Sequence, residues 1–153
     1  MLAIKNILHP TDFSQPAASA FLLARSLAKD HGARIILLHV VETPIVGPAG
    51  MVPFPPPAPP IDREGLRTQL EAIASAYPEL RIECRLAENQ PASAILDVAR
   101  ESGCDVIVMG SHGRTGLSRL LMGSVAEQVV RRATCPVLTV KTPAKSATEG
   151  ASS

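Results

Sequence analysis

The sequence has little aromatic surface and almost no net charge. Among its 153 residues there is no tryptophan, one tyrosine and three phenylalanines. The aromatic platforms on which single-stranded nucleic acid stacks would therefore be hard to build. The 15 basic and 14 acidic residues nearly cancel, and neither sign forms a long run, which argues against a broad surface for nucleic acid or anionic lipid. We expect an aliphatic core, no nucleic-acid partner and no membrane partner.

The sequence also lacks signals for export, membrane insertion and disulfide or zinc chemistry. No stretch approaches the roughly 18 apolar residues of a membrane helix, and residues 1–6 lack the basic start of a signal peptide. The three cysteines, Cys84, Cys104 and Cys135, are widely spaced and include no C-x-x-C pair. We therefore expect reduced, mostly buried thiols in a cytoplasmic protein.

Short apolar stretches alternate with amphipathic ones along the chain. Strands are expected near residues 4–8, 35–41, 82–86, 106–109 and 136–140. Helices are expected behind Ser14 as far as Gly32, from Asp62, from Pro91 to Ser102, and from Ser124, where the S-x-x-E spacing with Glu127 predicts a capping box. The third strand alternates apolar and charged residues, which predicts a half-exposed strand at the edge of the sheet.

This alternation is typical of a doubly wound α/β fold, a five-stranded parallel sheet with helices on both faces. We expect one folded unit over residues 1–142 and a disordered polar tail over residues 143–153. In such sheets a ligand binds beyond the carboxyl ends of the strands, where the winding direction reverses. Candidate site residues should therefore follow the strands.

A proline-rich loop is expected over residues 43–61, because eight prolines fall between residues 44 and 60. Loops of this length are often lids, docking segments or disordered insertions. A polyproline segment is also a ready ligand for aromatic grooves. The sequence leaves open an insertion without function, a cover for a neighbouring pocket and a docking site for a protein partner.

A glycine motif follows the buried fourth strand, with the spacing Gly110-x2-Gly113-x9-Gly123-Ser124. Glycine at Gly110 and Gly113 permits backbone conformations closed to other residues and lets N–H groups approach an anion. Gly123 and Ser124 then meet the start of a helix, whose unpaired N–H groups favour phosphate. The motif predicts a phosphate-binding loop, with Ser124 either capping the helix or donating to a phosphate.

Three charged or titratable side chains lie beside these strand ends. Asp12 follows the first strand, where a carboxylate could accept hydrogen bonds from two ribose hydroxyls or could serve as a turn or capping residue. His112 and Arg114 flank Gly113 and could pair with phosphate charge, although Arg114 fits a solvated loop equally well. His9 and His39 lie in or at the ends of apolar strands, and we interpret them as structural.

The order of elements and the glycine motif over residues 3–141 resemble the nucleotide-binding members of the universal stress protein family. The resemblance implies the adenine nucleotide alpha hydrolase-like fold, with strand order 3-2-1-4-5, and a homodimer formed through the last strand, residues 136–141. It implies ATP, or ADP or AMP, as the ligand, with Mg²⁺ as a candidate companion ion. It places these residues around the nucleotide: Pro10, Thr11, Asp12, Val40 and Val41 at the nucleoside, Met109 and Gly110 near the adenosine, and His112, Gly113, Gly123, Ser124 and Val125 at the phosphates.

Three functions fit this reading. The first is a regulatory module of the stress response that binds an adenine nucleotide. The second is a slow Mg²⁺-dependent ATPase, which is disfavoured because the sequence has no G-x-x-x-x-G-K-[ST] loop and no obvious acidic cluster for magnesium. The third is a nucleotide-free interaction protein that uses its proline-rich loop. The intact glycine motif favours the first.

Overall fold

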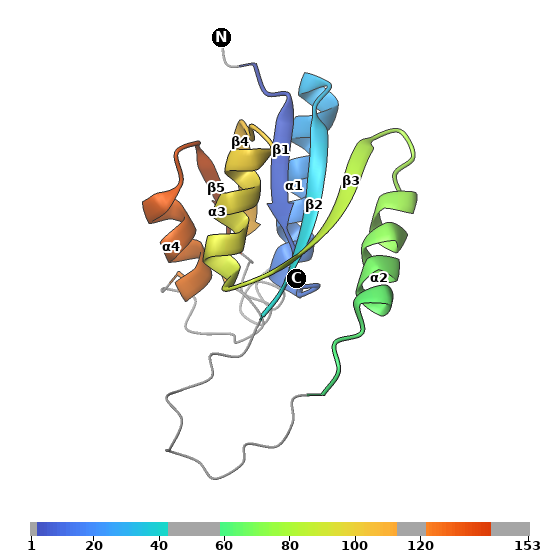
Figure 1. The fold of residues 1–153 in the computed structure, drawn as a ribbon. Coiled ribbons are helices and arrows are strands. Elements are labelled where there is room, and N and C mark those ends of the chain that lie inside the picture. The colour runs from blue at the N-terminus through green and yellow to red at the C-terminus, as the bar shows by residue number, and fades with distance from the viewer. Residues whose placement is uncertain (1–2, 43–58, 113–121, 142–153) are drawn as a thin grey trace, which may run out of the picture.

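A computed structural model of the chain describes residues 3–42, 59–112 and 122–141 (Figure 1). The strands are β1 (Asn6–Pro10), β2 (Arg34–Val41), β3 (Arg81–Glu88), β4 (Val106–Gly110) and β5 (Val137–Val140). The helices are α1 (Gln15–His31), α2 (Arg63–Ser75), α3 (Pro91–Glu101) and α4 (Ser124–Arg132). Most of the proline-rich loop, the residues Gly113 and Arg114, and the tail over 143–153 lie outside the described residues.

The strands form one parallel sheet in the order β3-β2-β1-β4-β5. This confirms the predicted fold class and strand order. β1 is central, so that Leu8 lies beside Ile36 of β2 and Ile107 of β4. The chain winds outward from β1 to β3 and then returns to wind outward through β4 and β5. The winding direction therefore reverses between β1 and β4.

Two helices cover each face of the sheet (Figure 1). Ile35 and Leu37 of β2 face α1 and α2, whereas Ile36 and Leu38 face α3 and α4. This alternation follows from the two-residue period of a strand. Because both faces are covered, the central strands are apolar over most of their length, as the sequence predicted. The small residues Ala20 and Ala24 let α1 pack close to the sheet.

The ends of α1 are those expected from the sequence. Ser14 is the N-cap, and its Oγ accepts a hydrogen bond from the Ala17 amide at 3.3 Å. Gly32 ends the helix in the left-handed region, with φ of 62°, where glycine carries no steric penalty.

The predicted capping box at the start of α4 is wrong. Gly123 is the N-cap, and Ser124 is the first helical residue with no capping hydrogen bond from its side chain. The Gly123 amide donates to the Ser111 carbonyl at 2.7 Å, and the Gly123 carbonyl accepts from the Glu127 amide at 2.9 Å. These bonds fix the cap one residue earlier than the S-x-x-E spacing indicated. The Ser124 hydroxyl is therefore not used as a cap.

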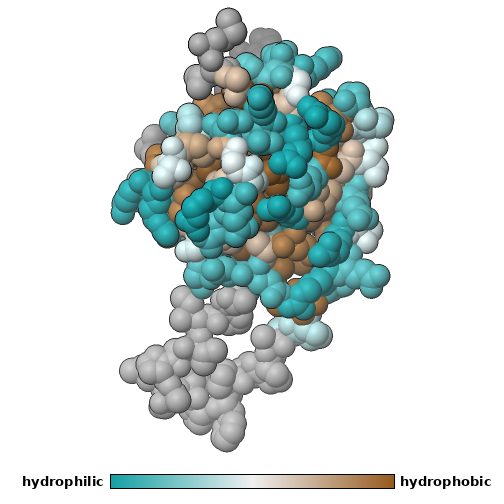
Figure 2. Space-filling view, turned by 45° about the horizontal axis from the view of Figure 1, so that its top comes forward, coloured by the Kyte–Doolittle hydropathy of each residue, from teal (hydrophilic) through white to brown (hydrophobic). Residues whose placement is uncertain are grey.

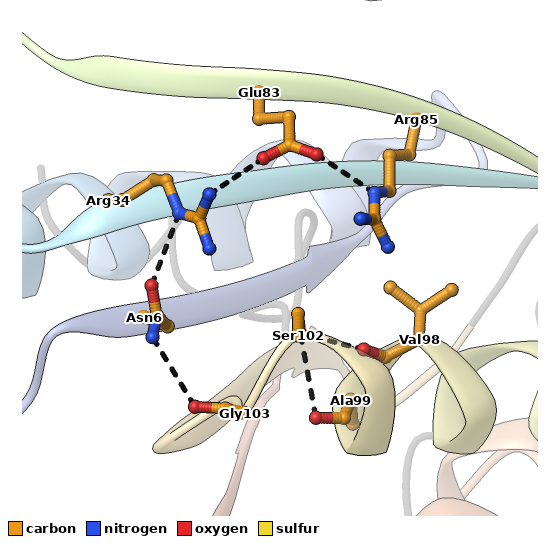
Figure 3. Close-up of polar contacts among 8 residues, drawn as sticks. All are labelled: Asn6, Arg34, Glu83, Arg85, Val98, Ala99, Ser102 and Gly103. Carbon is orange, nitrogen blue, oxygen red and sulfur yellow. Dashed lines mark hydrogen bonds and ion pairs between the residues drawn. The ribbon is translucent and has the colours of Figure 1, made fainter.

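β3 is a half-exposed edge strand, as predicted. On the face beside α3, Glu83 pairs with Arg34 and Arg85, each at 2.9 Å, and Arg34 Nε donates to Asn6 Oδ1 at 3.2 Å (Figure 3). Charged side chains on an edge strand discourage pairing with another sheet. This arrangement protects the β3 edge.

The cysteines are free and half-buried. The Cys104 thiol donates to the Val106 carbonyl at 2.9 Å. Burial and the neighbouring Cys135 raise the pKa of Cys104 to about 12, so this thiol is protonated at neutral pH and is a poor nucleophile.

The exposed surface is mainly hydrophilic on the side shown in Figure 2, with hydrophobic residues visible between the polar ones. Among the described residues, no helix combines the length and the apolar character needed to cross a membrane.

Candidate functional site

A cavity of about 300 Å³ lies at the carboxyl ends of β1, β2 and β4, where the winding reverses. The first turns of α3 and α4 and one residue of α1 complete its wall. This is the place where doubly wound sheets bind ligands, and the volume falls at the lower end of the range of small-molecule pockets.

Ten residues predicted from the sequence line this cavity. They are Pro10, Thr11, Asp12, Val40, Met109, Gly110, His112, Gly123, Ser124 and Val125. Val41 does not line it, because its side chain is buried in the sheet and its carbonyl accepts the Asn89 amide at 3.4 Å. Gly113 and Arg114 fall outside the described residues.

The turn after β1 is held by its own side chains. The Thr11 amide donates to the Leu38 carbonyl at 2.7 Å, and Thr11 Oγ1 accepts the Phe13 amide at 3.1 Å. Asp12 Oδ1 accepts the Ser14 amide at 3.0 Å. Asp12 thus stabilises the turn while also lining the cavity. The two roles that the sequence left open for it are compatible.

His39 supports the same turn, a link that no pattern in the sequence indicates. Its Nδ1 lies 2.8 Å from the Thr11 carbonyl and must carry the proton, since a carbonyl only accepts. Its ring contacts Phe13, with the centroids 4.7 Å apart. Phe13 has a positive φ of 62°, which is uncommon for a residue other than glycine. The histidine therefore helps to hold a strained turn beside the cavity.

The end of β4 and the start of α4 form the opposite wall. The Ser111 amide donates to the Val140 carbonyl at 3.0 Å, and Ser111 Oγ lies 3.0 Å from His112 Nδ1. The first intrahelical bond of α4 is donated by Glu127. The amides of Ser124, Val125 and Ala126 therefore precede the hydrogen-bonded part of the helix, at its positive end. This end of α4 offers an anion both N–H donors and a hydroxyl.

Gly110 is needed for a different reason from the one the motif suggested. Its φ is not positive, unlike those of Gly32 and Gly103. A Cβ at Gly110 would instead lie 3.1 Å from the backbone carbonyl carbon and oxygen of Pro16. Glycine here permits the first turn of α1 to approach the end of β4. The expectation that this position uses a conformation closed to other residues is wrong.

The cavity also has an apolar part that the sequence did not reveal. The additional lining residues are Ala17, Leu38, His39, Glu42, Pro91, Ile95, Ser111 and Ala126. Pro91 and Ile95 are one helical turn apart on α3, a spacing that predicts a shared face but not which cavity that face meets. The cavity thus joins an apolar wall to a polar end. Within the described ranges, no group of three or more His, Cys, Asp or Glu residues could hold a metal ion.

Comparison with known proteins assigns the family. The family model described as "Universal stress protein family" matches residues 3–141. The chain belongs to the universal stress protein family. A member of that family from Methanocaldococcus jannaschii, universal stress protein MJ0531, is 36% identical over 144 residues, covering 92% of this chain and 84% of the relative. The resemblance inferred from the glycine motif is confirmed.

Solved structures of universal stress proteins share this fold. One from Burkholderia pseudomallei has a TM-score of 0.69 and 29% identity, covering 92% of this chain and 98% of its own. Another, described as a universal stress protein in complex with cAMP, has a TM-score of 0.66 and 26% identity, covering 92% of this chain and 99% of its own.

Proposed function

We propose that this universal stress protein binds an adenine nucleotide, ATP or a close relative such as ADP or AMP, in the cavity between β1 and β4, and acts as a regulatory module in the stress response. The observation that carries the proposal is the start of α4. The first amides of α4 and the Ser124 hydroxyl, which does not cap the helix, border a cavity whose opposite part is apolar. A nucleotide has the matching division into an anionic end and a flat, weakly polar base.

The lining residues fit three parts of such a ligand. Leu38, Val40 and Ile95 offer an apolar surface to the base. Asp12, at the end of β1, is placed to accept hydrogen bonds from ribose hydroxyls. Ser124 and the N-terminal amides of α4 are placed to donate to phosphate oxygens. The related universal stress protein in complex with cAMP supports the adenine-nucleotide class.

Binding without dedicated turnover is the favoured form of this function. The sequence has no phosphate-loop lysine motif, and in phosphoryl-transfer enzymes a lysine and Mg²⁺ supply much of the charge stabilisation. Among the described residues, the cavity wall holds two acidic side chains, Asp12 and Glu42. Mg²⁺ commonly binds through one or two carboxylates together with nucleotide phosphates. These carboxylates could hold Mg²⁺, but because the phosphate-loop lysine motif is missing we expect at most slow hydrolysis.

Calorimetric titration with ATP, ADP, AMP and GTP in the presence of Mg²⁺ tests the proposal, after the purified protein has been checked for carried-over nucleotide. We expect saturable, adenine-selective binding. Ser124→Ala and Asp12→Asn should each weaken it by roughly threefold to a hundredfold, because each removes hydrogen bonds to the ligand. The matched controls Ser26→Ala and Asp30→Asn alter exposed residues of α1 and should leave the affinity unchanged.

Absence of binding to folded, nucleotide-free protein would refute the proposal and favour the interaction role of the proline-rich loop. Turnover that depends on Mg²⁺ and is lost in Asp12→Asn would favour the ATPase instead.

We also propose a homodimer formed through β5. This strand lies at the edge of the sheet, and its Leu138 side chain is 41% exposed. Val130 of α4, which precedes β5 in the chain, is 45% exposed. An apolar edge strand left unpaired invites association with another chain, and a second copy would satisfy its backbone groups.

A further inference from the structure

A second cavity lies on the opposite face of the sheet, between α1 and α2. Its volume is about 460 Å³, within the range of small-molecule pockets. His9 and Leu37 come from the sheet, Phe21 and Leu22 from α1, and Ile73 from α2, with Tyr77 just beyond α2. None of the described residues that line this α1–α2 groove carries a charge at neutral pH.

The aromatic side chains of the α1–α2 groove are held in place by their neighbours. Phe21 and Tyr77 meet edge to face, with centroids 5.6 Å apart, a favourable geometry for two rings. The guanidinium of Arg25 lies 3.7 Å from the centre of the Tyr77 ring, which adds a cation–π contact. The groove is therefore formed before any ligand enters it.

His9 gives the α1–α2 groove one polar atom that is not used by the protein. The residue is 1% exposed, and its Nδ1 lies 2.8 Å from the Val108 carbonyl. Because a carbonyl only accepts, Nδ1 carries the proton and Nε2 is left as an acceptor. No described residue donates to Nε2. The ring lines the groove, and since its Nδ1 edge is turned to β4, its Nε2 edge is the one available to a ligand.

The histidine keeps this acceptor under physiological conditions. Burial lowers the pKa of His9 to about 4, despite the opposing effects of the Val108 carbonyl and of Asp12. The ring is therefore neutral near pH 7, with a lone pair on Nε2. A donor supplied by a ligand could pair with this lone pair.

We propose that the α1–α2 groove is a second ligand site, specific for a small uncharged molecule with an aromatic or aliphatic body and one O–H or N–H group that donates to His9 Nε2. The apolar walls supply the area for the body. His9 Nε2 can only accept and therefore selects for a donor on the ligand, while the polar side chains of Gln15, Ser19 and Tyr77 also line the groove. A nucleotide suits this groove less well, because none of the described lining residues is cationic and the nearby Arg25 guanidinium is stacked on Tyr77. The site is thus chemically distinct from the cavity at β1 and β4.

The two cavities are separated by the turn after β1. Thr11 and Ala17 line both, Asp12 lines the first, and Phe13 lines the α1–α2 groove. A ligand in the groove would contact the same turn that presents Asp12 to a nucleotide. A ligand in one site should therefore change the affinity of the other site for its ligand, and the factor should be the same in both directions.

The full chain labelled with ¹⁵N, titrated with β-naphthol and with its methyl ether, tests this proposal by NMR. The two probes share an apolar body, but only the naphthol donates a hydrogen bond. We expect saturable shifts at Leu22 and Tyr77, an affinity for the naphthol roughly threefold to tenfold above that for the ether, and a shift of the His9 Nε2 resonance with the naphthol alone. Ala18→Trp should abolish these shifts, because exposed Ala18 lines the groove.

Ala72→Trp is the matched control, since Ala72 is exposed on α2 and does not line the groove. It should bind the naphthol as the wild type does, and circular dichroism verifies that both tryptophan variants are folded. Equal affinities for naphthol and ether would overturn the role of His9. Three results would overturn the site itself. They are shifts centred on Val125 rather than on Tyr77, unchanged binding by folded Ala18→Trp, and no saturation by about 1 mM, which corresponds to a binding free energy of about 4 kcal/mol.

Discussion

Acidification should destabilise the protein through His9, and the structure gives the size of the effect. His9 is buried and neutral in the folded state, where its pKa is lowered to about 4 from 6.5. As the pH falls below 6.5 the unfolded chain binds a proton at His9 before the folded chain does. Protonation thus favours unfolding. The contribution of His9 is fully present above pH 6.5 and is lost as the pH falls toward 4.

The magnitude follows from the difference between the two pKa values. This difference is roughly 2.5, and each pKa unit corresponds to about 1.36 kcal/mol, so the complete loss is about 3 kcal/mol. At about pH 4.5 the unfolded histidine is almost fully protonated, whereas about a quarter of the folded molecules carry the proton. We therefore expect the free energy of unfolding to fall by about 2.5 kcal/mol from this residue between about pH 7 and pH 4.5.

Urea denaturation of the wild type and of His9→Gln at the two pH values measures this term. The glutamine removes the titrating group while retaining an N–H donor for the Val108 carbonyl. The wild type should lose about 2.5 kcal/mol more than His9→Gln, a difference of about 1–2 M in the urea midpoint. His31→Gln, at the exposed end of α1, is the control and should follow the wild type. Equal losses in wild type and His9→Gln, or an NMR titration of folded His9 near 6.5, would show that burial does not lower the pKa of His9.

Two further predictions concern the packing of β4 and the edge at β5. Gly110→Ala should lower the free energy of unfolding by about 1–3 kcal/mol and weaken nucleotide binding, because its Cβ would press on Pro16. The control Gly32→Ala is strained at its φ of 62° but lies away from the cavity, and it should leave nucleotide binding intact. Equal nucleotide affinities in the two variants would contradict this prediction. Size-exclusion chromatography with light scattering should show a dimer, and Leu138→Glu should convert it to a monomer. Leu23→Glu, on the exposed surface of α1, is the control and should leave the dimer unchanged. A monomeric wild type at micromolar concentration would rule out the β5 dimer.

The fold could be predicted because the local signals agree. Apolar strands, the Ser14 cap and Gly32 each indicate the element boundary that the structure shows. The error at α4 arose because the S-x-x-E spacing is a local signal, whereas the cap is fixed by a bond from Gly123 to Ser111, twelve residues earlier. Long-range hydrogen bonds of this kind leave no pattern in the sequence near the helix.

The polar part of the candidate site was predictable, whereas its apolar part was not. Asp12 and Ser124 lie at the end of a strand and the start of a helix, and ligands of doubly wound sheets bind at such ends. Ile95 and Leu38 look like ordinary core residues in the sequence, and their place in the cavity depends on how α3 packs over β2. The role of His9 was also hidden, because the sequence indicates a structural histidine without showing that one ring nitrogen borders a groove.

Binding of an adenine nucleotide in the cavity between β1 and β4 underlies the proposed function. The most direct measurement is an NMR titration of the ¹⁵N-labelled chain with AMP and ATP, followed at the backbone amides. We expect saturable shifts that are largest at Val40, Gly110 and Val125, with ATP extending them along the first turn of α4. No saturable shift from either nucleotide, or shifts confined to the α1–α2 groove around Phe21 and Tyr77, would contradict it.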